Sequence, residues 1–402
     1  MAEFPTVARS SAWSVLAIFL RLGLTSFGGP IAHLGYFHHE FVTRRQWLSE
    51  RSYADLVALC QFLPGPASSQ VGIALGMSRA GYRGALAAWA GFTLPSAVLL
   101  IVFALGVSRY ADALGPGALH GFKVVAVAVV AQAVWGMAKN LCTDFTRIAL
   151  MAIAACGALL EPSAWGQVSV IVIAGLAGVM LCKPGPSDAH DSLPIPISRK
   201  SGAIWLSLFF ALLLGLPLLA GLTADRSVAM IDAFYRTGSL VFGGGHVVLP
   251  LLQAEVVPPG WVSNETFLAG YGAAQAVPGP LFTFAAFLGA SMNQVPSGWT
   301  GGLLCLLAIF APSFLLIAGV LPFWERLRRS VRTRAALAGI NAAVVGLLLT
   351  ALYDPVWTNA IFTLEDFGLA LAALIALMLW RLPAWLVVIG SGVVGGLMST
   401  TM

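Results

Sequence analysis

Two Pro-Gly-Pro triplets most constrain how this chain can fold. Pro64-Gly65-Pro66 and Pro278-Gly279-Pro280 each interrupt an apolar segment about as long as a membrane-spanning helix. Proline and glycine end one helix, and a proline is well placed as the first residue of the next. The pieces on either side, of about 10–12 residues, reach only half of a ~30 Å bilayer core. Because lipid cannot satisfy the freed backbone groups, each triplet predicts a broken, re-entrant helix near the bilayer midplane.

Composition sets the class of the protein. The chain has 402 residues, of which 58% are hydrophobic and only 10% charged, which predicts an all-α polytopic membrane protein and excludes a soluble one. The 22 Lys and Arg residues against 17 acids are typical of cytoplasmic loops, so we expect no nucleic-acid partner. The five cysteines are scattered, and no HExxH, GxSxG, Walker or Cys/His cluster is present. We therefore expect no enzyme, no cofactor and no metal.

The second half of the chain repeats the first. Equivalent residues follow each other at a nearly constant separation. The matched pairs are Arg21 with Arg236, Phe27-Gly28-Gly29 with Phe242-Gly243-Gly244, Glu40 with Glu255, Gln61 with Gln275, the two triplets, Pro95-Ser96 with Pro312-Ser313, Gly121 with Gly339, and Ala164-Trp165 with Ala384-Trp385. We expect a first repeat at 1–182, a linker with an extra transmembrane helix (about 203–222) at 183–227, and a second repeat at 228–402.

Loop charges predict the orientation of the two halves. The link 38–52 is basic whereas its counterpart 254–264 has no Lys or Arg, and 325–334 carries five Arg whereas 108–118 carries one. Opposite bias at equivalent loops predicts an inverted-topology repeat, with half-helices from both sides meeting near the midplane. If both broken segments of each half are re-entrant, the chain has nine full spans and a cytoplasmic N-terminus. A fully spanning Phe27-Gly28-Gly29 segment would change that number.

Three cations lie within apolar runs: Arg21, Arg236 and Lys123. Charges at membrane depth usually face a cavity or a partner, and the alternative is that each snorkels to an interface or pairs with an acid. Half-helices beginning after the breaks would add free N–H groups and the positive ends of helix dipoles. Together these features predict a binding site for an anion.

Other polar residues near the breaks add hydrogen-bond donors suited to a compact oxyanion. They are the hydroxyls of Ser68, Ser69 and Thr283 and the side-chain amides of Gln61 and Gln275.

Two glutamates, Glu40 and Glu255, hold equivalent positions in the two halves. They either neutralise the two arginines by pairing or take up protons in a coupled transport cycle. His33 and His246 are not equivalent, and each is either a proton carrier or a hydrogen-bonding residue. We include His33 with the glutamates as a coupling candidate and His246 among the substrate-binding candidates.

The motifs resemble those of the chromate ion transporter family in its long, two-domain form. The resemblance rests on Phe27-Gly-Gly-Pro with His33 and Glu40-Phe-Val, on Phe242-Gly-Gly-Gly-His246, and on the two Gln-x-x-Pro-Gly-Pro segments at Gln61 and Gln275. It covers nearly the whole chain. It implies substrate-binding roles for Arg21, Gly28, Gly29, Pro64, Gly65 and Pro66 and for Arg236, Gly243, Gly244, Pro278, Gly279 and Pro280.

The resemblance implies export of chromate across the bacterial inner membrane and hence chromate resistance. We expect a secondary transporter that works by alternating access around a midplane site, with chromate and the lipid bilayer as its partners. Sulfate or another oxyanion is the alternative substrate, and an anion channel is the alternative mechanism. Two inverted halves in one chain supply both repeats and leave a homodimer open.

Overall fold

The structure, a computed structural model, describes residues 11–114, 116–183, 197–242 and 244–401. Within these ranges every regular element is a helix, and no strand occurs. Six helices in the described part of the chain are long and apolar enough to cross a membrane. They confirm an all-α polytopic membrane protein. Among the nine predicted spans, those at α6 (Phe145–Leu160), α16 (Leu364–Met378) and α17 (Ala384–Thr401) do not meet this criterion in the described chain, so their full crossing stays a prediction.

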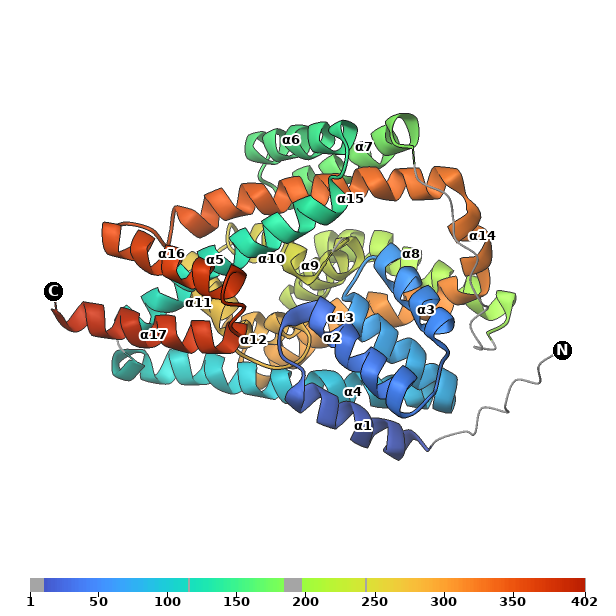
Figure 1. Ribbon diagram of the computed structural model, residues 1–402, viewed down its shortest axis with the longest axis horizontal. Coiled ribbons are helices and arrows are strands. Elements are labelled where there is room, and N and C mark those ends of the chain that lie inside the picture. The colour runs from blue at the N-terminus through green and yellow to red at the C-terminus, as the bar shows by residue number, and fades with distance from the viewer. Residues whose placement is uncertain (1–10, 115, 184–196, 243, 402) are drawn as a thin grey trace.

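The described residues of the first half form seven α-helices, with a break after the first and another after the third (Figure 1). They are α1 (Ala12–Thr25), α2 (Gly29–His38, followed by a π-helical turn at His39–Arg44), α3 (Glu50–Phe62), α4 (Ala67–Leu114), α5 (Pro116–Leu141), α6 (Phe145–Leu160) and α7 (Ala164–Leu181).

The second half follows the same order after the extra helix α8 (Arg199–Thr223). Its helices are α9 (Arg226–Leu240), α10 (Val248–Val256), α11 (Asn264–Ala274), α12 (Phe284–Ala290), α13 (Gly298–Val320), α14 (Trp324–Arg329), α15 (Val331–Ala351), α16 (Leu364–Met378) and α17 (Ala384–Thr401). Short 3-10 turns at Gly245–Val247 and Leu281–Thr283 precede α10 and α12, another at Leu321–Phe323 precedes α14, and a π-helical turn at Leu352–Trp357 follows α15.

Local capping starts equivalent helices at equivalent residues. The Ser49 hydroxyl accepts the N–H of Ser52 at the start of α3, and the Ser263 hydroxyl accepts the N–H of Thr266 at the start of α11. A capping serine satisfies a donor that the helix itself leaves free. The two half-helices that lead into the Pro-Gly-Pro breaks therefore begin in the same way.

The long element α4 is a helical hairpin. Its chain turns at Gly81, whose φ is +60°. A Cβ atom placed on Gly76 would collide with the carbonyl oxygen of Gly84. Eight residues of straight helix rise about 12 Å, so this contact requires the chain to reverse. The first part of α4 is thus a half-helix like α12, and its second part corresponds to α13.

The last helix pair of each half packs on the other half. α6 and α7 pack along α15, while α16 and α17 pack along α5 (Figure 1). Glycines allow a close approach: a Cβ on Gly121 would strike the carbonyl oxygen of Ser391, and one on Gly339 would strike that of Ala174. Small residues permit such backbone contact between helices in membranes. The exchange interlocks the two halves.

Helix α8 lies outside this interlocked body, at the place predicted for the extra span. It packs against α9 and α13, and only 6% of its most apolar window is buried. Large apolar side chains without protein cover suit a lipid environment. They include Ile204, Leu208, Phe210, Leu214, Leu218 and Leu222.

Candidate functional site

The two kinds of break lie against each other across the repeat. The backbone N–H of Gly65 donates to the carbonyl oxygen of Val241 at 2.7 Å, and the N–H of Gly279 donates to that of Ser26 at 2.9 Å. Each Pro-Gly-Pro break is therefore bonded to the glycine-rich break of the opposite half. A break leaves backbone groups without helical partners, and these bonds satisfy two of the donors. Neither half could make this crossing alone.

Glycine is required at the centre of each triplet. Gly65 and Gly279 have φ angles of +119° and +94°, which side chains rarely allow. A Cβ on Gly65 would lie 2.9 Å from the Ser313 hydroxyl, and a Cβ on Gly279 would lie 2.9 Å from the Ser96 hydroxyl. These two serines are repeat equivalents. The same close packing thus occurs twice, with the halves exchanged.

The last prolines of the two triplets, Pro66 and Pro280, precede different kinds of helix. Pro66 immediately precedes α4 and accepts the N–H of Gln70 at 2.9 Å, as expected for a residue that starts a half-helix. The Gln70 side chain is fully buried and donates to the carbonyl oxygen of Pro64 at 2.6 Å. Pro280 instead precedes a 3-10 turn, and its carbonyl oxygen accepts both the N–H and the hydroxyl of Thr283.

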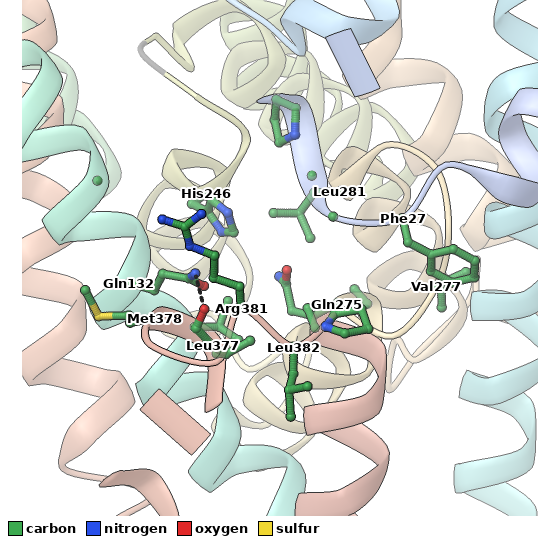
Figure 2. Close-up of a pocket in the computed structure, with 18 of the residues that line it drawn as sticks. Phe27, Gln132, His246, Gln275, Val277, Leu281, Leu377, Met378, Arg381 and Leu382 are labelled. Atoms are coloured by element: carbon green, nitrogen blue, oxygen red, sulfur yellow. Dashed lines mark hydrogen bonds between the residues drawn. The ribbon is translucent and has the colours of Figure 1, made fainter. Parts of the chain in front are cut away.

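A cavity of about 620 Å³ lies beside the crossing (Figure 2). Both halves of the chain line it, through the first break of each half, the second break of the second half, α5 and the α16–α17 connection. The lining residues are Phe27, Gly28, Gly29, Pro30, Val129, Gln132, Trp135, Gly136, His246, Ala274, Gln275, Val277, Gly279, Leu281, Leu377, Met378, Arg381, Leu382, Pro383 and Ala384. A concave, mostly apolar space with a few polar groups is the usual form of a small-ligand site.

The polar side chains of this cavity include hydrogen-bond donors. The side-chain nitrogen of Gln275 is buried and has no hydrogen-bond partner in the described part of the chain. The Nδ1 atom of His246 lies 2.8 Å from the Tyr271 hydroxyl, which orients the ring. The Gln132 amide donates to the carbonyl oxygen of Leu377 over a long 3.5 Å. Of these three groups, the Gln275 nitrogen is therefore the donor that an oxyanion could use without breaking another hydrogen bond.

The structure brings some of the predicted substrate-binding residues to this cavity and places others elsewhere. Those that line it are Gly28, Gly29, His246, Gln275 and Gly279. Gln61 is exposed at the end of α3, and Gly244 lies in the break before α10. Gly243 lies outside the described residues. Ser68 is buried beside His33, with Oγ and Nδ1 3.4 Å apart.

Arg21 is paired with Glu40. Its guanidinium lies 3.0 Å from the carboxylate, which also contacts Arg44 at 3.1 Å and Arg45 at 2.6 Å. The Arg21 side chain is 57% exposed, whereas that of Glu40 is 3% exposed. One buried carboxylate thus holds three arginines at the end of the α1–α2 unit.

Arg236 has the repeat-equivalent partner and one more. It lies 2.8 Å from Glu255 and 2.9 Å from Asp232, and all three side chains are nearly buried. Its guanidinium also lies over the ring of Trp165, 4.8 Å from the centroid. In both halves the structure therefore pairs the intramembrane arginine with the equivalent glutamate, the first of the two roles considered for these acids.

Lys123 in α5 has a weaker partner. Its ammonium group lies 3.4 Å from Glu265 at the start of α11, and the Glu265 side chain is 82% exposed. A pair with one fully solvated partner contributes little. All three cations predicted from the apolar runs consequently have an acidic partner.

Comparison with known proteins identifies the family. The profile described as chromate transporter matches residues 13–179 and, a second time, residues 228–396. This chain belongs to the chromate transporter family. The two matched segments each contain one glycine-rich break and one Pro-Gly-Pro break, so both halves of the crossing lie in family sequence.

Two relatives match most of this chain, and a shorter one matches less than half of it. A probable chromate transport protein of Synechococcus elongatus is 27% identical over 94% of this chain and 93% of its own length. The chromate transport protein of Pseudomonas aeruginosa is 28% identical over 83% of this chain and 78% of its own. An uncharacterized transporter of Bacillus subtilis, YwrA, is 30% identical over 42% of this chain but 96% of its own length. No solved structure matches the chain.

In this member of the family, two charged residues were not recognised from the sequence. Asp232 was missed because it stands one turn before Arg236 and has no acidic counterpart in the first half. Arg381 was missed because it stands in the Leu-Trp-Arg-Leu-Pro connection between α16 and α17, where a cytoplasmic loop charge is ordinary. Only the three-dimensional path of that connection brings Arg381 to the cavity wall.

Proposed function

We propose that this protein is a secondary transporter that exports chromate from the cytoplasm across the bacterial inner membrane and so confers chromate resistance. The observation that carries the proposal is the cavity beside the crossed breaks, which both halves line and whose polar side chains include hydrogen-bond donors. Relatives named for chromate transport in two bacteria support chromate as the substrate. Membership of a transporter family also favours a role that involves no catalysis.

The proposed architecture is an inverted repeat. Equivalent hydrogen bonds are exchanged between the halves, and α6–α7 and α16–α17 exchange partners in the same way. This reciprocity supports a two-fold relation between 1–182 and 228–402, and the loop charges support an axis in the membrane plane. The broken segments would then meet near the midplane, which is where such transporters bind their substrates.

In the proposed cycle, chromate enters the cavity from the cytoplasm and is held by donors at the breaks. One group of helices then moves against the other and opens the site outward. The inside-negative potential favours anion exit by about 2.3 kcal/mol per charge per 100 mV. For a dianion this is about twice as large, so the cycle does not require protons, although Glu40, Glu255 and His33 stay candidates for coupling.

Everted membrane vesicles test this proposal, because export from the cell becomes uptake. Labelled chromate uptake should saturate, should depend on the imposed potential, and should be absent from vesicles without the protein. Uptake of sulfate alone would keep the mechanism and change the substrate. Very high, non-saturating flux would indicate a channel. No flux of either anion would contradict the proposal.

Two glycine variants test whether the crossed breaks are part of the transport path. Gly65→Ala and Gly279→Ala each place a Cβ at positive φ against a serine hydroxyl, which we expect to destabilise the crossing by about 1–3 kcal/mol. Chromate uptake should fall sharply in both. Gly260→Ala is the matched control: its φ is +72°, but no atom lies within 4 Å of the added Cβ. Equal uptake in all three variants would remove the crossing from the mechanism.

A further inference from the structure

The charges that the sequence placed in the membrane are already neutralised. Arg21, Arg236 and Lys123 each lie within 4 Å of a carboxylate. A paired cation has lost most of its attraction for a further anion, because its field is largely cancelled at short range. An anion in the cavity needs positive charge from another residue.

Arg381 is such a residue. It lines the cavity, and Figure 2 shows its side chain extending from the α16–α17 connection toward the part of the wall formed by His246. In the described part of the chain, no carboxylate lies within 4.0 Å of its guanidinium. Among the described residues that line the cavity there is no aspartate and no glutamate. Its charge is therefore not cancelled nearby.

The backbone of the connection orients Arg381 in an unusual way. Its φ is +52°, in the left-handed region that residues other than glycine rarely adopt. The turn is held by two hydrogen bonds, from the N–H of Trp380 to Ile375 at 3.2 Å and from the N–H of Leu382 to Ala376 at 2.9 Å. Sparsely populated backbone conformations of this kind concentrate at ligand sites.

A hydrogen-bond donor without a partner belongs to another residue that lines this cavity. The side-chain nitrogen of Gln275 is buried and unbonded in the described chain, and it stands at the Pro-Gly-Pro break of the second half. Leaving a buried donor unpaired is unfavourable, and an acceptor that reached this break would remove that cost. An anion is an acceptor.

We propose that Arg381 is the anion-binding cation of this transporter and that it holds a tetrahedral, doubly charged oxyanion with the help of the Gln275 amide. The inference rests on the proposed function and assigns its substrate subsite. A planar guanidinium donates two parallel hydrogen bonds to two oxygens of one oxyanion, which a lysine cannot do. A dianion of small radius gains most from such a fork.

The proposed subsite occurs in only one of the two repeats, because the equivalent position in the first half holds an acid. Arg381 stands three residues before Ala384-Trp385, and Glu161 stands three residues before the equivalent Ala164-Trp165. The α6–α7 and α16–α17 connections thus carry opposite charges at equivalent positions. A carboxylate repels an anion, so the duplicated scaffold provides one anion subsite per chain and not two.

Equilibrium binding to the purified full-length protein tests the subsite directly. Labelled chromate and labelled sulfate are titrated against wild type, Arg381→Gln and Arg381→Lys. Loss of a charge-assisted hydrogen-bonded pair should weaken binding about 10- to 100-fold in the glutamine variant, and loss of the fork alone should weaken it several-fold in the lysine variant. Glu161→Gln is the matched control from the other half, and Arg332→Gln is a control for removal of an exposed cation elsewhere; both should bind as wild type does.

The outcomes separate the subsite from the proposed function. Wild-type affinity in Arg381→Gln, with saturable chromate uptake intact, would overturn the subsite and leave the transport proposal standing. Sulfate binding alone, weakened by Arg381→Gln, would support the subsite and overturn chromate as substrate. Wild type that binds neither anion would overturn both. If size-exclusion chromatography shows that Arg381→Gln is not folded, binding to Arg381→Lys is the test. Unchanged affinity of Arg381→Lys for the anion would then overturn the subsite.

Discussion

The same ion pair occurs in both halves of this protein, in surroundings of opposite charge. Around Glu40 stand three arginines, one of them Arg21 with a 57% exposed side chain. Around Arg236 stand two carboxylates, and its own side chain is 9% exposed. The Arg–Glu pair has thus been kept at equivalent positions while its neighbours have diverged.

The difference indicates what the pair does. In both halves the arginine near the end of the first helix binds the glutamate that follows the break, so the pair ties the two arms of the broken segment together. Neighbouring charges are not needed for that task, which explains why they differ. The same difference makes the two arginines unequal in their energetic importance, because burial decides how costly a lost partner is.

Replacing Arg236 should have the largest effect on stability. Arg236→Gln leaves Asp232 and Glu255 buried without their cation, and removal of one partner of a buried pair costs about 3–5 kcal/mol. We expect poor expression and a strongly lowered melting temperature in detergent. Adding Asp232→Asn should recover part of the loss, because it removes one of the two uncompensated charges.

Arg21→Gln is the comparison variant. Glu40 keeps Arg44 and Arg45, and Arg21 is largely exposed, so the expected change in stability is about 0–1 kcal/mol. Equal losses for the two variants would mean that the surroundings do not matter and would break the comparison. Chromate uptake by the same two variants also tests a direct role: intact uptake in both would exclude these arginines from the transport path.

The breaks could be predicted from the sequence because their causes are local. Gly65 and Gly279 each stand between two prolines, and such a triplet cannot continue a helix whatever surrounds it. The same holds for the start of α3 and α11 at a capping serine. The reversal within α4 also occurs at a glycine, Gly81, whose φ is +60°.

The partners across the breaks could not be predicted, because they depend on the tertiary path. Nothing near Gly65 in sequence indicates that its N–H binds Val241, in the other half of the chain. Arg381 illustrates the same limit, since its loop position gave no sign of a cavity. Arg21, conversely, was noticed because a charge in an apolar run is conspicuous, although only the structure shows that Glu40 neutralises it.

The exchanged helix pairs give a second comparison between the halves, with a smaller expected effect. Gly121→Val and Gly339→Val each force a side chain against a neighbouring backbone, and overpacking of this kind costs about 1–3 kcal/mol. Similar decreases in the melting temperatures of these two variants would fit a two-fold relation between the halves of the chain. Gly390→Val on α17 is the control, because no atom lies within 4 Å of its added Cβ. A large loss in only one of the two test variants would show that one half carries the stability of the exchange.

Lys123 should matter least. It is paired at 3.4 Å with Glu265, whose side chain is 82% exposed, and a pair with a largely solvated partner contributes about 0–1 kcal/mol. Its equivalent in the second half is Asn341. Lys123→Asn therefore gives both halves the same residue, and the melting temperature should hardly change. Chromate uptake by this variant then tests a role in transport. A loss of uptake at wild-type stability would place the lysine in the transport path. Unchanged uptake would leave it as a residue of the helix packing.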